Sequence, residues 1–140
     1  MTAKEWLMRA RRLDAEIGAL IEEQKRAWDR AVSAAAGCTD DKVQTSRTNT
    51  SEARFVCYAD YARRIDRRID ELYAVKCEIM DAIARVEDGT LRTLLIERYI
   101  NFKTWENIAE RLGMTEEWIR KRLHRKALEK IDQTRNQFPA

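Results

Sequence analysis

The stretch Thr104–Ile131, TWENIAERLGMTEEWIRKRLHRKALEKI, decides how the C-terminal part of this chain folds. Thr104 and Thr115 each precede a helical pattern, where a threonine oxygen can accept a hydrogen bond from a free backbone N–H. Gly113 stands where the first helix must end, a position that often needs positive φ. The stretch therefore predicts two helices joined by a tight turn. The apolar residues at helical spacing in the first are Trp105, Ile108, Ala109 and Leu112.

The second predicted helix, residues 115–131, is rich in cations. Glu116 and Glu117 lie in its first turn, where the helix dipole favours acids. A helix, a short turn and a cationic helix form the pattern of a helix-turn-helix, whose second helix enters the major groove of DNA. Leu91, Leu94 and Tyr99 predict a further helix that closes the small core. The six cations after Trp118 are Arg120, Lys121, Arg122, Arg125, Lys126 and Lys130.

The run GMTEEWIRKRLHR, residues 113–125, resembles region four of bacterial sigma factors. LLIERY at 94–99, together with the Trp-x-x-Ile-Ala motif, is similar to sigma-like late-gene regulators of phages and prophages, the ArpU/RinA kind. The resemblance covers about residues 90–131 and implies that helix 115–131 reads a promoter element. Glu117 matches a glutamate that reads bases and Arg120 a nearby basic contact. Glu116 departs from the primary sigma pattern, which has arginine there, so a different target sequence is expected.

The candidate DNA-contacting residues follow from their place on the second helix. At about 100° per residue, Ile119 and Leu123 point inward and the charged residues point outward. Arginine and lysine pair with guanine, while glutamate can accept a hydrogen bond from cytosine. Two alternatives stay open: the glutamates can serve the helix dipole alone, and the cations can form a solvated face. His124 is expected to contact phosphate or to lie at the surface, and Trp118 has no assigned role. The predicted set is Thr115, Glu116, Glu117, Arg120, Lys121, His124, Arg125 and Lys130.

Upstream, two long segments show heptad seams typical of packed helices. Mostly apolar or small residues alternate at four and three residues from Trp6 to Ala31, with Gln24 among them, and again from Tyr58 to Val86, where Lys76 is the polar exception. We expect an all-α protein: a long antiparallel helical hairpin, a coiled-coil-like arm, followed by a helix-turn-helix domain. A plain amphipathic helix and intermolecular pairing satisfy the same pattern. The expected divisions are 1–32 and 52–87 for the arm helices, 33–51 for a flexible loop, 88–133 for the DNA reader and 134–140 for a frayed tail.

Composition limits the function. The chain has 140 residues, 36% of them charged, with one proline and four glycines, which suits a helical protein. The net charge of +3 belongs to the C-terminal part, because residues 1–87 hold 16 cations and 16 anions and residues 88–140 hold 11 and 8. The sequence contains one histidine, no Gly-rich phosphate loop and no nucleophile–base set, so no enzyme, cofactor or metal site is expected.

The cysteines and the hydropathy of the sequence bear on the cellular compartment in which the protein is expected. Cys38, Cys57 and Cys77 are odd in number and form no CxxC motif, so we expect reduced thiols in the cytoplasm. No apolar stretch approaches the ~20 residues that span a bilayer, and no membrane partner is expected.

These patterns predict a sequence-specific DNA-binding transcriptional regulator, and the resemblance implies one of phage or prophage type. Its reader would bind double-stranded DNA, while the arm forms a homo-oligomer or contacts RNA polymerase. The alternative is a DNA-packaging subunit of the small terminase kind or another assembly protein with a helix-turn-helix. A third possibility is a protein-binding module without a DNA role.

Overall fold

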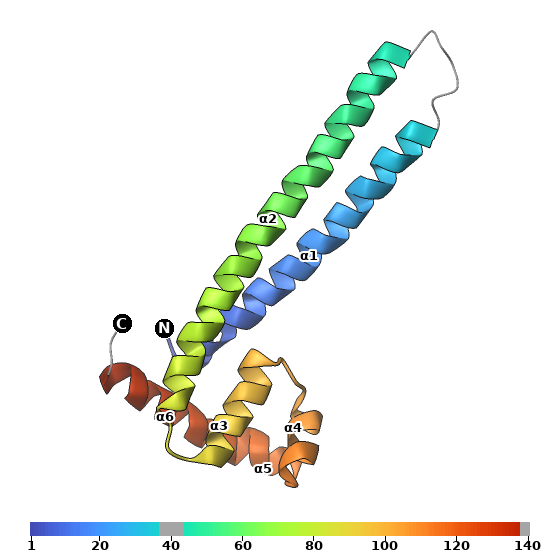
Figure 1. The fold of residues 1–140 in the computed structure, drawn as a ribbon. Coiled ribbons are helices and arrows are strands. Elements are labelled where there is room, and N and C mark those ends of the chain that lie inside the picture. Colours follow the sequence, from blue (N-terminus) through green and yellow to red (C-terminus); the bar gives the residue numbers. More distant parts are fainter. Residues whose placement is uncertain (37–43, 138–140) are drawn as a thin grey trace. The chain divides into compact units, whose positions relative to one another are not determined.

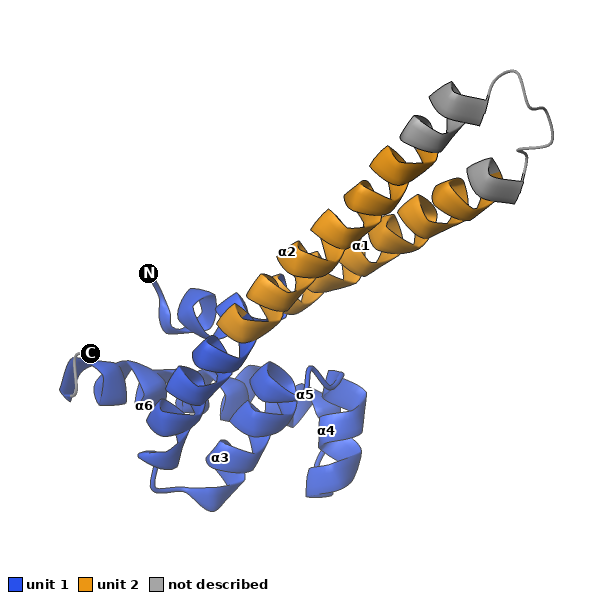
Figure 2. Cartoon of the chain, turned by 45° about the horizontal axis from the view of Figure 1, so that its top comes forward, with its two compact units in different colours: residues 1–12, 72–140 blue, residues 13–71 orange. Residues whose placement is uncertain are grey.

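The computed structural model describes residues 1–36 and 44–137 of the chain, and the side chains of 34–36 and 44–50 are outside this description. The described residues form helices and turns without a strand, so the predicted all-α class is confirmed (Figure 1). Two compact units divide the chain: residues 13–71, and residues 1–12 with 72–140 (Figure 2). The helices are α1 (Ala3–Ala36), α2 (Gln44–Ala84), α3 (Gly89–Leu95), α4 (Trp105–Leu112), α5 (Glu116–Trp118) and α6 (His124–Gln137), with π-helical turns η2 (Ile96–Ile100) and η3 (Ile119–Leu123).

Unit 2, residues 13–71, is an antiparallel pair of helices formed by α1 and α2 (orange in Figure 2). Arg68 Nε lies 2.9 Å from a carboxylate oxygen of Glu16, and Trp28 contacts the rings of Phe55 and Tyr58. Residue numbers rise along one helix while their partners' numbers fall along the other, which defines the antiparallel direction. The long helix pair predicted from the heptad spacing is therefore confirmed. Seam residues buried in this unit are Ile17, Ala27, Ala31 and Ile65.

The predicted loop 33–51 is wrong at both ends. Helix α1 continues to Ala36 and α2 begins at Gln44, so only residues 37–43 remain between them. These residues, which include Cys38, lie outside the described part of the chain. The Ser- and Thr-rich composition suggested a loop, but these residues oppose a helix only by a few tenths of a kcal/mol each. Helices that are already long extend through such residues at little cost.

Unit 1 joins the first turns of α1 and the last turns of α2 to the C-terminal helices (blue in Figure 2). Its core contains buried side chains from α1, α2, α3, α4 and α6 and from both π turns, because short helices must share one core to exclude water. Arg9 of α1 forms an ion pair with Glu78 of α2 at 3.1 Å. Lys76, the polar exception in the seam, has its ammonium 4.9 Å from the centre of the Phe102 ring. Core residues include Leu7, Ile79, Ile83, Leu91, Leu94, Leu95, Tyr99, Ile108, Ile119 and Ile131.

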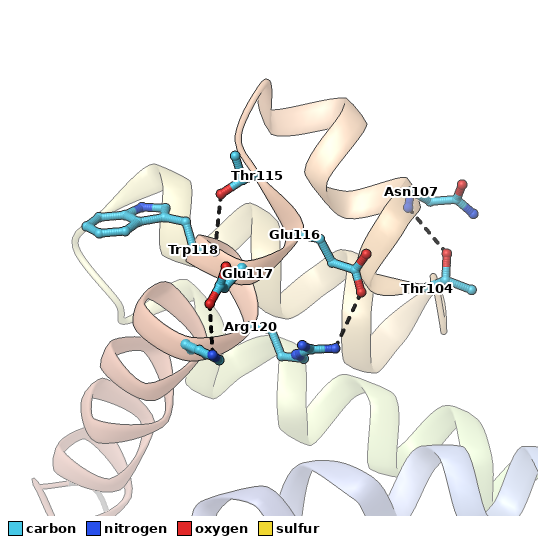
Figure 3. Close-up of polar contacts among 8 residues, drawn as sticks. Thr104, Asn107, Thr115, Glu116, Glu117, Trp118 and Arg120 are labelled. Atoms are coloured by element: carbon cyan, nitrogen blue, oxygen red, sulfur yellow. Dashed lines mark hydrogen bonds and ion pairs between the residues drawn. The ribbon is translucent and has the colours of Figure 1, made fainter.

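Side-chain caps fix where the short helices begin. Thr104 Oγ1 accepts a hydrogen bond from the Asn107 N–H, and Thr115 Oγ1 accepts one from the Trp118 N–H, as predicted (Figure 3). Gly113 has φ 66° and ends α4, also as predicted. Helix α3 begins at Gly89, and the side chain of Asp88 caps it by accepting a hydrogen bond from the Thr90 N–H. A carboxylate is a stronger acceptor there than a hydroxyl.

The C-terminal segment stays helical further than predicted. We expected residues after Ile131 to fray, but α6 continues to Gln137. Thr134 is buried and its hydroxyl donates a hydrogen bond to the Lys130 carbonyl, so this turn belongs to the core. The polar composition of this segment did not predict the extension. A threonine whose hydroxyl donates to a carbonyl of its own helix can be buried without leaving an unsatisfied polar group.

Replacing Ile65 by Asp tests the packing of the helix pair. The side chain of Ile65 is 7% exposed, and an unpaired carboxylate there should lower the free energy of unfolding by several kcal/mol. The matched control is Arg67→Asp, which introduces the same carboxylate at an exposed position of the same helix. Thermal melting followed by circular dichroism checks both variants. Equal melting temperatures for the two variants would contradict the assigned seam.

Candidate nucleic-acid interface

The cationic helix, residues 116–137, is one helical run that contains a π-helical turn. The backbone N–H of His124 bonds to the carbonyl of Ile119, five residues earlier, instead of the usual four. One extra residue in this turn rotates everything after it relative to an ideal α-helix. The buried residues along the run are consequently Ile119, His124, Ala127, Ile131 and Thr134.

This shift moves His124 into the core, so the prediction that it lies at the surface is wrong. The prediction assumed about 100° per residue throughout, which would place Leu123 inward. Because of the π turn, His124 lies on the same side of the helix as Ile119. His124 is only 9% exposed, whereas Leu123 is half-buried. The imidazole therefore leaves the set of candidate contacts.

His124 is held by two aromatic residues of neighbouring segments. Its Nε2 is hydrogen-bonded to the hydroxyl of Tyr99, which lies in the other π turn, and the Trp105 ring meets it edge-on at 4.7 Å between centroids. Burial lowers the pKa of His124 to about 4, and the charges of Lys4 and Arg98 add to this effect. Burial likewise raises the pKa of Tyr99 to about 12. Both groups are thus neutral near pH 7.

The cations of the helix separate onto two sides. Four of them line a shallow groove on one side with Lys4 of α1, and Glu129 and Asp132 also border this groove. Lys126 and Lys130 line a second hollow beside Glu87 and Asp88 of the α2–α3 turn. The structure therefore does not bring Lys130 together with the other predicted contacts. The four cations in the first groove are Arg120, Lys121, Arg122 and Arg125.

Glu116 and Glu117 pair with cations one turn further along the helix. Arg120 approaches Glu116 at 3.5 Å, and Lys121 Nζ lies 2.8 Å from Glu117 (Figure 3). All four side chains are at least two-fifths exposed, and such (i, i+4) pairs stabilise a helix by only about 0.3–0.5 kcal/mol. The pairs keep the side chains ordered and are weak enough to be exchanged for contacts with a ligand.

Arg122 and Trp118 complete the exposed surface. Arg122 was not among the predicted contacts, although it belongs to the same cationic run and borders the groove. Its guanidinium lies 5.8 Å from the centre of the Trp118 ring, and that indole is 49% exposed. Figure 3 shows the indole projecting outward, away from the Glu116–Arg120 pair. An arginine over an exposed aromatic ring presents a flat cation beside an apolar face.

Thr115 serves the start of this helix through its cap and is itself exposed. Across the described residues, no three His, Cys, Asp or Glu side chains gather in a way that could hold a metal ion. None of the described helices is long and apolar enough to cross a membrane. Comparison with protein-family models, with characterised proteins and with solved structures found no significant match. Any function must therefore be inferred from the geometry of this chain.

The buried imidazole predicts a specific pH dependence of stability. Unfolding exposes His124, which then binds a proton near pH 6.5, whereas the folded form stays neutral down to about pH 4. The unfolded state binds more protons in this window, so stability is full above pH 6.5 and falls as the pH drops toward 4. One such group contributes a slope of up to ~1.4 kcal/mol per pH unit.

Denaturant unfolding of the parent and of His124→Gln between pH 4 and 7 checks this expectation. His124 is the chain's single histidine, so carboxylate titrations remain in both proteins and cancel in the difference. Glutamine keeps a hydrogen-bonding side chain but does not titrate. Parallel curves of unfolding free energy against pH would contradict a buried, neutral His124.

Proposed function

We propose that this chain is a sequence-specific DNA-binding regulator of transcription, of the sigma-like phage or prophage type. Helix 116–137 enters the major groove, and the groove cations Arg120, Lys121, Arg122 and Arg125 contact DNA there. Glu117 and Arg120, in the first turns, read base edges. The protein acts in the cytoplasm, and the helix pair of residues 13–71 binds a second copy of the chain or RNA polymerase.

One observation supports this proposal above the others: exposed cations gather on one side of a helix that follows a turn at Gly113. Of these cations, Arg122 and Arg125 form no ion pair with any carboxylate of the described residues. Unneutralised positive charge in a shallow groove attracts a polyanion, and phosphate contacts supply most non-specific affinity for DNA. A turn that begins with glycine and a Thr-capped second helix also suit a helix-turn-helix.

The proposed interface is smaller than the predicted set. Lys130 is left out because it lines a separate hollow and is not among the cations that line the groove. His124 is left out because it is buried. Thr115 and Glu116 position the helix start and its first cation, and Arg122 is added.

An assembly protein that packages DNA is the second candidate. It is favoured by the exposed apolar side chains of the helix pair, because surface patches of this kind mark contacts with other chains. Such a protein would form a ring and bind near a packaging site, whereas a regulator would occupy promoters. Occupancy mapping in cells distinguishes the two. The exposed apolar residues are Ile21, Trp28, Val32, Phe55 and Val56.

Salt dependence tests which side of the helix meets phosphate. The log of affinity for duplex DNA should fall linearly with the log of salt, by about 0.9 per phosphate neutralised. Arg122→Ala with Arg125→Ala should make the slope shallower by about 2. The matched control is Lys126→Ala with Lys130→Ala, which removes two cations from the other side of the same helix. An equal effect of both pairs, or affinity independent of salt, would contradict the proposal.

Selection from a random DNA pool tests base reading. Glu117→Ala or Arg120→Ala should relax preference at one base position, because a lost base contact costs ~1–3 kcal/mol of discrimination. Lys130→Ala is the control and should leave the selected motif unchanged. If both first-turn variants select the parental motif, specificity arises from DNA shape or from a partner.

A further inference from the structure

The groove beside the cationic helix contains a residue from the opposite end of the chain. Lys4, in the first turn of α1, lines it together with Arg120, Lys121, Arg122 and Arg125. Five cations thus face two carboxylates, and one of these, Asp132, is already 3.7 Å from Arg135. Lys4 forms no ion pair among the described residues.

The first turn of α1 is held firmly in this position. A capping box closes it: the Thr2 N–H donates to Glu5 at 2.8 Å, and the Glu5 N–H donates to Thr2 Oγ1 at 3.2 Å. Trp6 and Leu7 are buried, and the Trp6 ring lies 5.1 Å from the guanidinium of Arg135 in α6. Lys4 is therefore fixed beside α6 through its own helix and does not belong to a loose terminus.

A second cation of α1 lies on the same side as Lys4. Arg11 follows it by seven residues, or about two helical turns, so both side chains share one face. Burial, and after it the positive charge of Arg11, lower the pKa of Arg98. Neither Arg11 nor Arg98 forms an ion pair with a carboxylate among the described residues.

We propose that Lys4 and Arg11 form a second row of phosphate contacts, so that duplex DNA lies against α1 as well as against the cationic helix. The inference rests on the proposed function and specifies its interface. Like charges that outnumber the neighbouring carboxylates repel one another, and contact with phosphates, which releases the counterions of the DNA, relieves this repulsion. Arg98 is held in place by its own contacts: its guanidinium stacks on the Trp105 ring at 4.4 Å and donates to the Lys103 carbonyl.

The test compares the salt dependence of binding to a fluorescent duplex by anisotropy. Between about 50 and about 200 mM salt, Lys4→Ala with Arg11→Ala should lose roughly tenfold less affinity than the parent, the amount expected for two phosphate contacts. The control Arg12→Ala removes a positive charge from the residue that follows Arg11. Arg12 lies on the same face of α1 as Glu5, and not on the face of Lys4 and Arg11. This control should lose as much affinity with salt as the parent.

A charge-preserving variant guards against a folding defect. Lys4→Arg with Arg11→Lys should keep the parental salt slope. If the two residues acted only through the fold and not through their charge, the alanine and the charge-preserving double variants would show the same salt slope. A parental slope in the alanine variant, or an equal effect of Arg12→Ala, overturns the inference while the Arg122 and Arg125 variants still report on the cationic helix. Absence of salt-dependent binding by the parent overturns the proposed function and this inference together, and an acidic protein partner would then be indicated.

Discussion

The hydrogen bond between Tyr99 and His124 is the contact on which the exposed surface of the C-terminal helices depends. Each residue lies in or at the end of a π turn, and these turns bring the two polar groups together inside the core. With His124 inward, Arg122 and Arg125 must face outward on one side and Lys126 and Lys130 on the other. A buried pair of neutral groups therefore determines where the positive charge lies. π turns are uncommon and occur frequently at functional sites.

The distribution of charge follows from the same geometry. Cations that lie beside carboxylates, such as Lys130 near Asp88, contribute mainly to the surface of the fold. In the groove, Arg122 and Arg125 form no ion pair among the described residues, and the repulsion between neighbouring cations is tolerated because water and salt screen it. This is a modest cost for a surface that attracts a polyanion. The exposed ion pairs of Glu116 and Glu117 fit the same account, since pairs of this strength order side chains without preventing new contacts.

Much of the fold was predictable from local patterns. Heptad spacing identified the helix pair, and Thr104, Gly113 and Thr115 identified the ends of α4 and the start of α5, because caps depend on a few adjacent residues. The position of His124 was not predictable, since a π turn depends on core packing between distant segments. Lys4 could not be connected to the groove either, because the contact joins residues far apart in sequence. The bounds of long helices were misjudged where polar residues continue a helix, as at Gln44 and Thr134.

An NMR titration of the labelled protein with a duplex selected from a random pool tests the central claim most directly. We expect perturbed side-chain signals for Arg122 and Arg125, and an unchanged neutral ring at His124, because the groove side of the helix meets DNA while the core stays intact. Signals from the helix pair, such as Trp28, should not move in the same titration unless DNA binding also changes assembly, which sedimentation detects separately. Perturbation confined to Lys126 and Lys130, or none in helix 116–137, would contradict the account.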